Sequence, residues 1–193
     1  MLACLPLRAQ DCAGVLQYGA DRATSHYLPV YIHTDGVCPD DTLQLVAVRD
    51  EDKIYLTGMP SECRTPRCEY IIRKSYYDVL FADSTTIRYY EPYLTNYSSG
   101  ELFIMLKGRV VTRTFHPKTY KAKCRYTYAK AELLEKMLHT PIVAIQACHA
   151  TPRTEWEEKP YKAEYTPGSR LQLSPQTAAR LMLALQCLAA RVQ

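Results

Sequence analysis

Glycine is scarce in this sequence, and the few glycines do not cluster. The chain has 7 glycines among 193 residues, so it lacks the glycine-rich loop that cradles phosphate groups in nucleotide-binding enzymes. The H-E-x-x-H pattern of zinc proteases and the G-x-S-x-G pattern of serine hydrolases are also absent. These three classes of enzyme are therefore not predicted.

Long hydrophobic runs are lacking as well. No apolar segment approaches the thickness of a bilayer, so no membrane contact is expected. The opening Met1–Leu7 is short and has no basic leader, which argues against a signal peptide and for a cytoplasmic protein. The net charge of +4 suits an anionic ligand but falls short of what duplex nucleic acid requires, so no such partner is predicted.

Paired metal ligands are also missing. Of the 8 cysteines, Cys63 and Cys68 are the closest in sequence, and no second pair or histidine doublet completes a four-ligand zinc site. We therefore predict neither a metal nor a cofactor. Because no secretory leader precedes them, the cysteines are expected to be reduced and packed as small hydrophobic side chains.

What the sequence does contain is a series of short strand-like runs. At 193 residues, 47% of them hydrophobic, the chain predicts a single domain over 1–193, or two lobes over about 1–118 and 119–193. Thr42–Arg49 and Lys53–Thr57 flank a polar turn and predict a hairpin. The other predicted strands are Leu28–His33, Tyr70–Arg73, Tyr76–Phe81, Thr86–Tyr90, Leu102–Leu106, Val110–Phe115 and Ile142–Cys148. Such spacing is typical of a small barrel or sandwich.

Two helices are predicted in this mainly β chain. Ser174 and Pro175 are typical of an N-cap and first helical position, so a C-terminal helix should run to about Ala190. Pro167-Gly168 before it predicts a turn. The interior helix is predicted over Tyr126–Met137, where Leu133, Leu134 and Met137 share one stripe with Lys130 and Tyr126.

Lys130 and Tyr126 are the first candidate functional residues. A helix would turn both toward the protein body, where burial lowers a lysine pKa and a nearby cation lowers a tyrosine pKa, which suits proton transfer. The alternative is that the Lys130 stem lies over apolar surface and Tyr126 is a half-buried core residue. His26 precedes a strand, where a loop residue can project into a cleft.

The order of several short motifs resembles the poxins, the cyclic-dinucleotide nucleases of poxviruses, baculoviruses, moths and butterflies. The matching segments are His26-Tyr27-Leu28-Pro29; Lys53-Ile54-Tyr55-Leu56-Thr57-Gly58-Met59-Pro60; Leu106-Lys107-Gly108 with Phe115, Pro117 and Tyr120; Tyr126 with Lys130; Thr140-Pro141-Ile142-Val143; and Pro167-Gly168-Ser169-Arg170-Leu171. The sequence departs from the family at Val30, where the family often has glycine.

The resemblance implies a chymotrypsin-like β-barrel arrangement and a homodimer. It implies metal-independent cleavage of 2′,3′-cGAMP, in which a ribose 2′-hydroxyl attacks the neighbouring 3′–5′ phosphodiester. The linear product no longer activates STING. The implied location is the host cytosol if the chain is viral. The family's catalytic trio maps onto His26, Tyr126 and Lys130. Which group is base and which is acid stays open.

Substrate contacts follow from the same resemblance and from chemistry. Tyr27 and Tyr120 could stack on a purine, and Arg125 could meet a phosphate. The basic cluster of the family's late strand is reduced in this sequence to Lys159, Lys162 and Arg170, of which Lys162 and Arg170 are predicted substrate contacts. The alternative interpretation is that these residues form a solvated basic edge and core or rim tyrosines.

Three other functions remain open at this point. The chain could be a relative that binds cyclic dinucleotides without cleaving them, because fold does not fix function. It could be a viral chymotrypsin-like cysteine protease that uses Cys148 or Cys124, although no glycine near Cys148 suits an oxyanion turn. It could also be an interaction domain that docks through its C-terminal helix.

Overall fold

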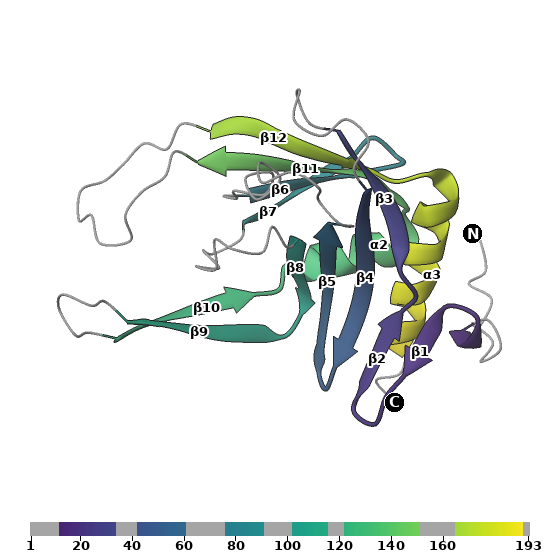
Figure 1. Cartoon of the computed structure of the whole chain (residues 1–193), viewed down its shortest axis with the longest axis horizontal. Helices are drawn as coiled ribbons and strands as arrows, with labels where there is room; N and C mark the ends of the chain where they lie inside the picture. The colour runs from purple at the N-terminus through teal and green to yellow at the C-terminus, as the bar shows by residue number, and fades with distance from the viewer. Residues whose placement is uncertain are drawn as a thin grey trace.

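The computed structural model describes residues 12–33, 42–60, 76–90, 102–115, 122–150 and 165–190 (Figure 1). Within these ranges the chain is mainly antiparallel β-sheet with two helices, as predicted. The strands are β1 (Leu16–Tyr18), β2 (Arg22–Ser25), β3 (Leu28–His33), β4 (Thr42–Asp50), β5 (Lys53–Pro60), β6 (Tyr76–Phe81), β7 (Thr86–Tyr90), β8 (Leu102–Lys107), β9 (Arg109–Phe115), β10 (Ala122–Tyr128), β11 (Ile142–Ala150) and β12 (Tyr165–Gln172); the helices are α2 (Ala131–His139) and α3 (Pro175–Ala190).

Ten of the strands form one sheet that curves strongly. Along the chain of neighbours β8–β5–β4–β3–β12–β11–β6–β7 every pairing is antiparallel, and β4, β5 and β8 cross β6, β7, β11 and β12 in Figure 1. The two end strands meet where the Met105 amide donates to Tyr89 Oη at 3.1 Å. Among the described strands no ladder joins β7 to β8, so this sheet is not a closed barrel.

The predicted hairpin of β4 and β5 is confirmed. Its ladder runs from Asp50↔Lys53 to Leu43↔Pro60, and Glu51 in the two-residue connection has φ 53°, as tight hairpin turns require. Deep in the same hairpin, a Cβ on Gly58 would lie 2.5 Å from Leu43 Cδ2. Glycine at position 58 of the family-like motif therefore has a packing role.

Pro167 and Gly168 do not form the predicted turn, because both lie within β12. The ladder to β11 shifts register at this point, since Gln146 pairs with Arg170 whereas Cys148 pairs with Pro167. A β-bulge is one of the few places in a sheet that accepts proline, which has no amide hydrogen to donate. The turn signal therefore marked an irregularity within a strand.

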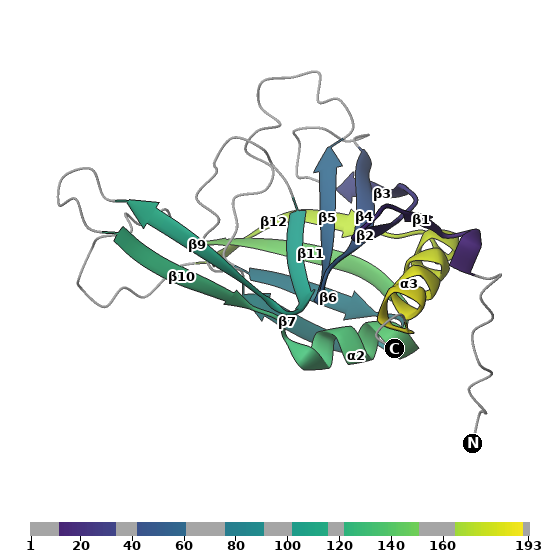
Figure 2. The ribbon, with the colours of Figure 1, turned by 90° about the horizontal axis from the view of Figure 1, so that it is seen from below.

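The C-terminal helix begins and ends as predicted. Ser174 Oγ accepts a hydrogen bond from the Thr177 amide at 3.1 Å and so caps α3. Leu181, Leu185 and Leu188 are fully buried in the single hydrophobic cluster of the described residues. The helix contacts β3, β4 and α2, and Figure 2 shows it beside one end of the sheet. The two-lobe alternative, with its boundary near residue 118, falls outside the described ranges and stays a prediction.

The prediction of a helix from Tyr126 is wrong. Residues 122–128 form β10, paired with β9 from Ala122↔Phe115 to Tyr128↔Arg109, and α2 begins only at Ala131. Tyr126, Thr127 and Tyr128 are aromatic and β-branched types, which favour a strand once a partner strand is available. The apolar part of the stripe is confirmed, because Leu133 and Met137 are buried in α2.

The expectation of reduced cysteines is also wrong for one pair. Cys12 and Cys187 form a disulfide across a sequence separation of 175 residues, and it fastens the N-terminal segment to α3. Cys148 is a free, buried cysteine. Disulfides are rare in a reducing cytosol, so the cytoplasmic location stays a prediction. No helix within the described ranges is long and apolar enough to cross a membrane.

Candidate functional site

His26 lies at a bulge where β2 continues into β3. Three residues, 25–27, stand opposite two residues of β4, since Thr24 pairs with Val48 and Leu28 pairs with Leu45. The buried Ser25 fixes the bulge, because its Oγ accepts the Ala47 amide at 2.9 Å. The partly exposed His26 ring lies 3.1 Å, Nδ1 to Nε2, from Gln17 on β1. The imidazole is thus held at an accessible irregular point of the sheet.

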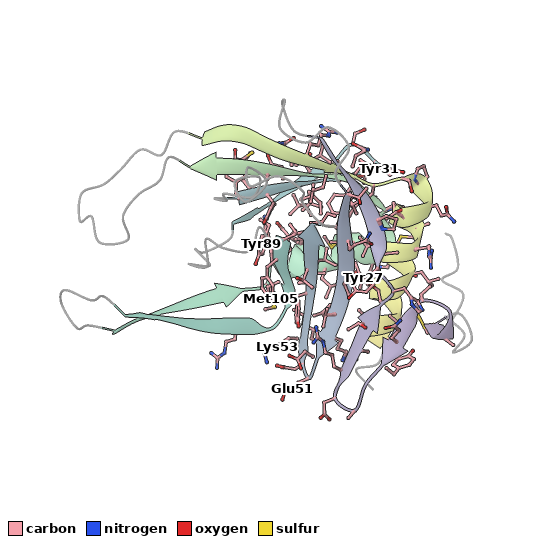
Figure 3. The ribbon with its side chains drawn as sticks, viewed as in Figure 1. Tyr27, Tyr31, Glu51, Lys53, Tyr89 and Met105 are labelled. Carbon is pink, nitrogen blue, oxygen red and sulfur yellow. A yellow bond between two sulfur atoms is a disulfide. The ribbon has the colours of Figure 1, made fainter. Side chains whose placement is uncertain are left out.

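Tyr27 follows His26 directly, whereas Arg170 pairs with His33 at the other end of β3, roughly 20 Å from His26 along the strand. Tyr27, just before β3, is 72% exposed and Tyr31, on β3, is 56% exposed; both are labelled in Figure 3. Arg170, on the neighbouring strand β12, is exposed and its Nε lies 3.4 Å from Gln172 Oε1. Gln172 pairs with Tyr31 in the ladder. Imidazole, phenol and guanidinium groups are therefore available on adjoining strands.

Lys130 lies elsewhere, at the N-cap of α2. Its Nζ donates to the Arg88 carbonyl oxygen at 2.9 Å and forms an ion pair with Glu132 at 2.7 Å. The side chain remains 39% exposed. The prediction that Lys130 lies within the apolar face of the helix is therefore wrong, because position 130 precedes the helix, although its side chain is partly desolvated.

Beyond Lys130, four side chains of β6, β7 and β11 form a cluster that the sequence reasoning missed. The Arg88 guanidinium contacts Asp78 through two hydrogen bonds of 2.7 and 2.8 Å and lies 3.8 Å from the centre of the Tyr76 ring. A hydrogen bond with the Cys148 side chain, together with burial, raises the pKa of Tyr76 to about 12. Asp78 and Arg88 are cross-strand partners, a pairing that only strand register reveals.

This cluster also bears on the cysteine-protease alternative. Cys148 is 6% exposed and is engaged with the Tyr76 hydroxyl. A nucleophilic thiol needs access to substrate and an electropositive, partly exposed surrounding. The surroundings of Cys148 are those of a packed side chain, whereas the side chain of Cys124 on β10 lies outside the described set.

The remaining predicted residues are placed only in part. Tyr126 and Arg125 occupy consecutive ladder positions of β10, opposite Val111 and Thr112. Tyr120 and Lys162 lie outside the described residues. Within the described ranges no three His, Cys, Asp or Glu side chains gather in a way that could hold a metal ion.

The structure thus sorts the predicted residues into two groups. His26 and Tyr27 precede β3 and Arg170 lies opposite the far end of that strand, whereas Arg125, Tyr126 and Lys130 belong to β10 and the start of α2. The Ala129 amide bonds the Gly108 carbonyl, so the second group adjoins the end of β8. Between β3 and β8 lie β4 and β5, which places three strand spacings, about 14 Å along the sheet, between the groups. The structure does not bring His26 beside Lys130.

Comparison of the chain with protein-family models, with curated proteins and with solved structures finds no match.

Proposed function

We propose that the chain is a metal-independent nuclease that cleaves the 3′–5′ phosphodiester of 2′,3′-cGAMP and so antagonises cGAS–STING signalling. The observation that carries the proposal is the ordered set of poxin-like motifs, with Tyr126 and Lys130 at the end of a segment rich in lysine and arginine. Between Leu102 and Ala131 the sequence has no aspartate or glutamate. Such a segment favours phosphate binding, and the Glu132 carboxylate, which pairs with Lys130 at 2.7 Å, must release Lys130 when a phosphate binds, because it would repel the phosphate.

The fold supports the proposal at a coarser level. The resemblance implies a chymotrypsin-like β-barrel arrangement, and the chain has an eight-strand antiparallel path whose ends meet at Tyr89 and Met105. We propose that this curved sheet corresponds to that barrel arrangement, in which its two end strands meet through the hydrogen bond from the Met105 amide to Tyr89 Oη.

In the proposed reaction the 2′-oxygen forms a bond to phosphorus while the bond from phosphorus to the 5′-oxygen breaks. A base removes the 2′-hydroxyl proton, an acid protonates the 5′-oxygen, and positive charge stabilises the phosphorane. Lys130 can supply the charge and polarise the Tyr126 hydroxyl, and His26 can donate to the leaving oxygen, because imidazole titrates near neutral pH. The cyclic ligand itself holds the 2′-hydroxyl near the phosphorus.

We further propose that the site is completed by a second copy of the chain. In one copy, β4 and β5 stand between His26 and the Tyr126–Lys130 segment. A separation of about 14 Å along the sheet is longer than the reach over which three side chains can act on one phosphodiester. In a two-fold symmetric homodimer each site can take His26 from one copy and Lys130 from the other. The proposed dimer is supported by the need to bring His26 close to Lys130, as well as by the resemblance.

The test measures cleavage of 2′,3′-cGAMP in EDTA by chromatography. His26→Ala, Tyr126→Phe and Lys130→Ala should each lower the rate by about 10²–10⁴-fold, the usual worth of acid–base groups. Arg180→Ala, an exposed change on α3, should leave it unchanged. Intact substrate at high wild-type concentration would end the nuclease proposal, and ligand binding without product would favour the inactive binding protein.

Mixing two inactive variants separates a shared site from a site within one chain. Equal amounts of the His26→Ala and Lys130→Ala proteins, allowed to exchange subunits, should regain roughly a quarter of wild-type activity, because half the dimers are mixed and one of their two sites is intact. No recovery, although mass spectrometry shows mixed dimers, would place the whole trio in one chain.

A further inference from the structure

The polar atoms of His26 all have partners except one ring nitrogen. Its amide donates to the Val15 carbonyl oxygen at 3.1 Å. Its carbonyl oxygen accepts from the Ser25 hydroxyl at 2.9 Å, and its ring Nδ1 lies 3.1 Å from Gln17 Nε2. Among the described residues nothing contacts the ring Nε2, and the side chain is partly exposed. Nε2 is therefore the atom of His26 that is left for a ligand.

The strand that carries Gln17 is anchored to the body of the fold. β1 pairs with β2 along its whole length (Figure 1), and Leu16, beside Gln17, is buried in the core. Upstream of the strand, Cys12 is cross-linked to Cys187 on α3. The Gln17 side chain is exposed, but it approaches His26 from a fixed backbone.

The chemistry of the Gln17 amide decides which ring nitrogen of His26 carries hydrogen. The amide nitrogen has two hydrogens to donate and accepts nothing, so Nδ1 must accept with its lone pair. A neutral imidazole has a single N–H, and its hydrogen then lies on Nε2. When the ring is protonated, both nitrogens carry hydrogen, and the amide can rotate so that its oxygen accepts from Nδ1. In either state Nε2 is a hydrogen-bond donor.

We infer that Gln17 is a positioning residue that keeps a hydrogen on Nε2 of His26. Its role in catalysis rests on the proposed function, in which His26 donates to the leaving oxygen. There the protonated ring gives its Nε2 proton to the 5′-oxygen as the bond from phosphorus to that oxygen breaks. The neutral ring that remains carries its hydrogen on Nδ1, where the Gln17 amide oxygen accepts it, and a proton from solvent restores the ring.

NMR measures the position of the ring hydrogen without any substrate. Long-range proton–nitrogen spectra of the full-length protein at about pH 9, where an imidazole is neutral, should show the His26 hydrogen on Nε2, with His26→Gln assigning the signals. Gln17→Glu keeps the side-chain length but leaves only acceptor oxygens, so it should move the hydrogen to Nδ1. Gln17→Lys keeps only a donor and should leave the hydrogen on Nε2.

Ala20→Glu is the matched control for the added charge. It places the same carboxylate at an exposed position between β1 and β2, and it should leave the hydrogen on Nε2. Thermal melts show whether each variant is folded. The inference would be overturned by a wild-type hydrogen on Nδ1, by an unchanged tautomer in Gln17→Glu, or by an equal change in Ala20→Glu.

Cleavage kinetics test the positioning role in the reaction. Gln17→Leu removes the side-chain hydrogen bond and keeps the backbone contacts of His26. Because Gln17 does not bind substrate in the proposed reaction, kcat should fall about 3- to 10-fold, the usual worth of one hydrogen bond, with KM unchanged. An unchanged kcat, or a loss carried by KM, would overturn this role. If the wild-type protein leaves 2′,3′-cGAMP intact, the proposed function fails and the role in the reaction with it, whereas the spectra still decide whether Gln17 fixes the ring.

Discussion

The Cys12–Cys187 disulfide gives the most direct test of the structure, because the sequence predicted the opposite. The perturbation is removal of the cross-link, either by reductant or in the Cys12→Ser, Cys187→Ser double variant. The bond closes a loop over a separation of 175 residues, nearly the whole chain. Cutting it leaves the folded contacts of α3 in place but releases the unfolded chain from this restraint.

The magnitude follows from the length of the loop. In the chain-entropy treatment, a loop of this size contributes about 5 kcal/mol to the free energy of unfolding at 25 °C, near the upper end of measured disulfides. With a urea m-value of about 2 kcal/mol/M for a chain of this size, the midpoint should fall by roughly 2.5 M. The loss arises because the reduced unfolded chain gains conformations that the cross-linked chain cannot adopt.

The assay is urea denaturation followed by circular dichroism, with four samples: wild type and double variant, each with and without reductant. Reductant should lower the midpoint of the wild type and leave the double variant unchanged. Peptide mapping without reduction should recover one linked peptide pair containing Cys12 and Cys187. A wild-type shift smaller than about 0.5 M, or an equal shift in both proteins, would refute the reasoning.

Two smaller changes test packing and charge. Gly58→Ala should destabilise the fold by about 1–3 kcal/mol, because the new methyl group would overlap the buried Leu43 side chain. Gly14→Ala is the matched control in a thermal melt, since a Cβ at position 14 would have no atom within 4 Å. Equal melting temperatures of the two variants would contradict the packing argument. Lys136, which ion-pairs with Asp83, holds the pKa of that carboxyl at about 2 instead of 3.8. The stabilisation from this ion pair is therefore present above pH 3.8 and is lost as the pH falls toward 2. The free energy of unfolding should therefore fall less steeply between about pH 4 and pH 2 in Asp83→Asn than in wild type. Identical pH dependence of the two proteins in this range would rule out the ion pair as the source of the loss.

The two groups of predicted residues change how the resemblance to poxins is used. Motif order along a chain says nothing about distance across a sheet, and here β4 and β5 separate His26 from Lys130. Arg88, whose carbonyl oxygen accepts from Lys130 and whose guanidinium pairs with Asp78, comes from a strand that no motif singled out. The variants that matter most for function are therefore those that compare the two regions with each other.

Local patterns were sufficient for much of the fold. The patterns of Thr42–Arg49 and Lys53–Thr57 predicted β4, β5 and their turn, because the side-chain period of a strand and the polarity of a turn are properties of neighbouring residues. Ser174 and Pro175 likewise predicted the start of α3, since an N-cap acts on amides within one helical turn.

Tertiary structure decided the features that depend on distant partners. Tyr126 became part of a strand because β9 supplied a ladder for it, and local propensity is weak compared with such pairing. Cys12 met Cys187, and Pro167 entered β12, only because the fold placed α3 and β11 beside them. The sequence by itself determined most of the central strands and the start of α3. The pairing of the segments decided the structure of 122–128 and of 165–172, and which candidate functional residues lie together, because contact across a sheet depends on strand order and not on order along the chain.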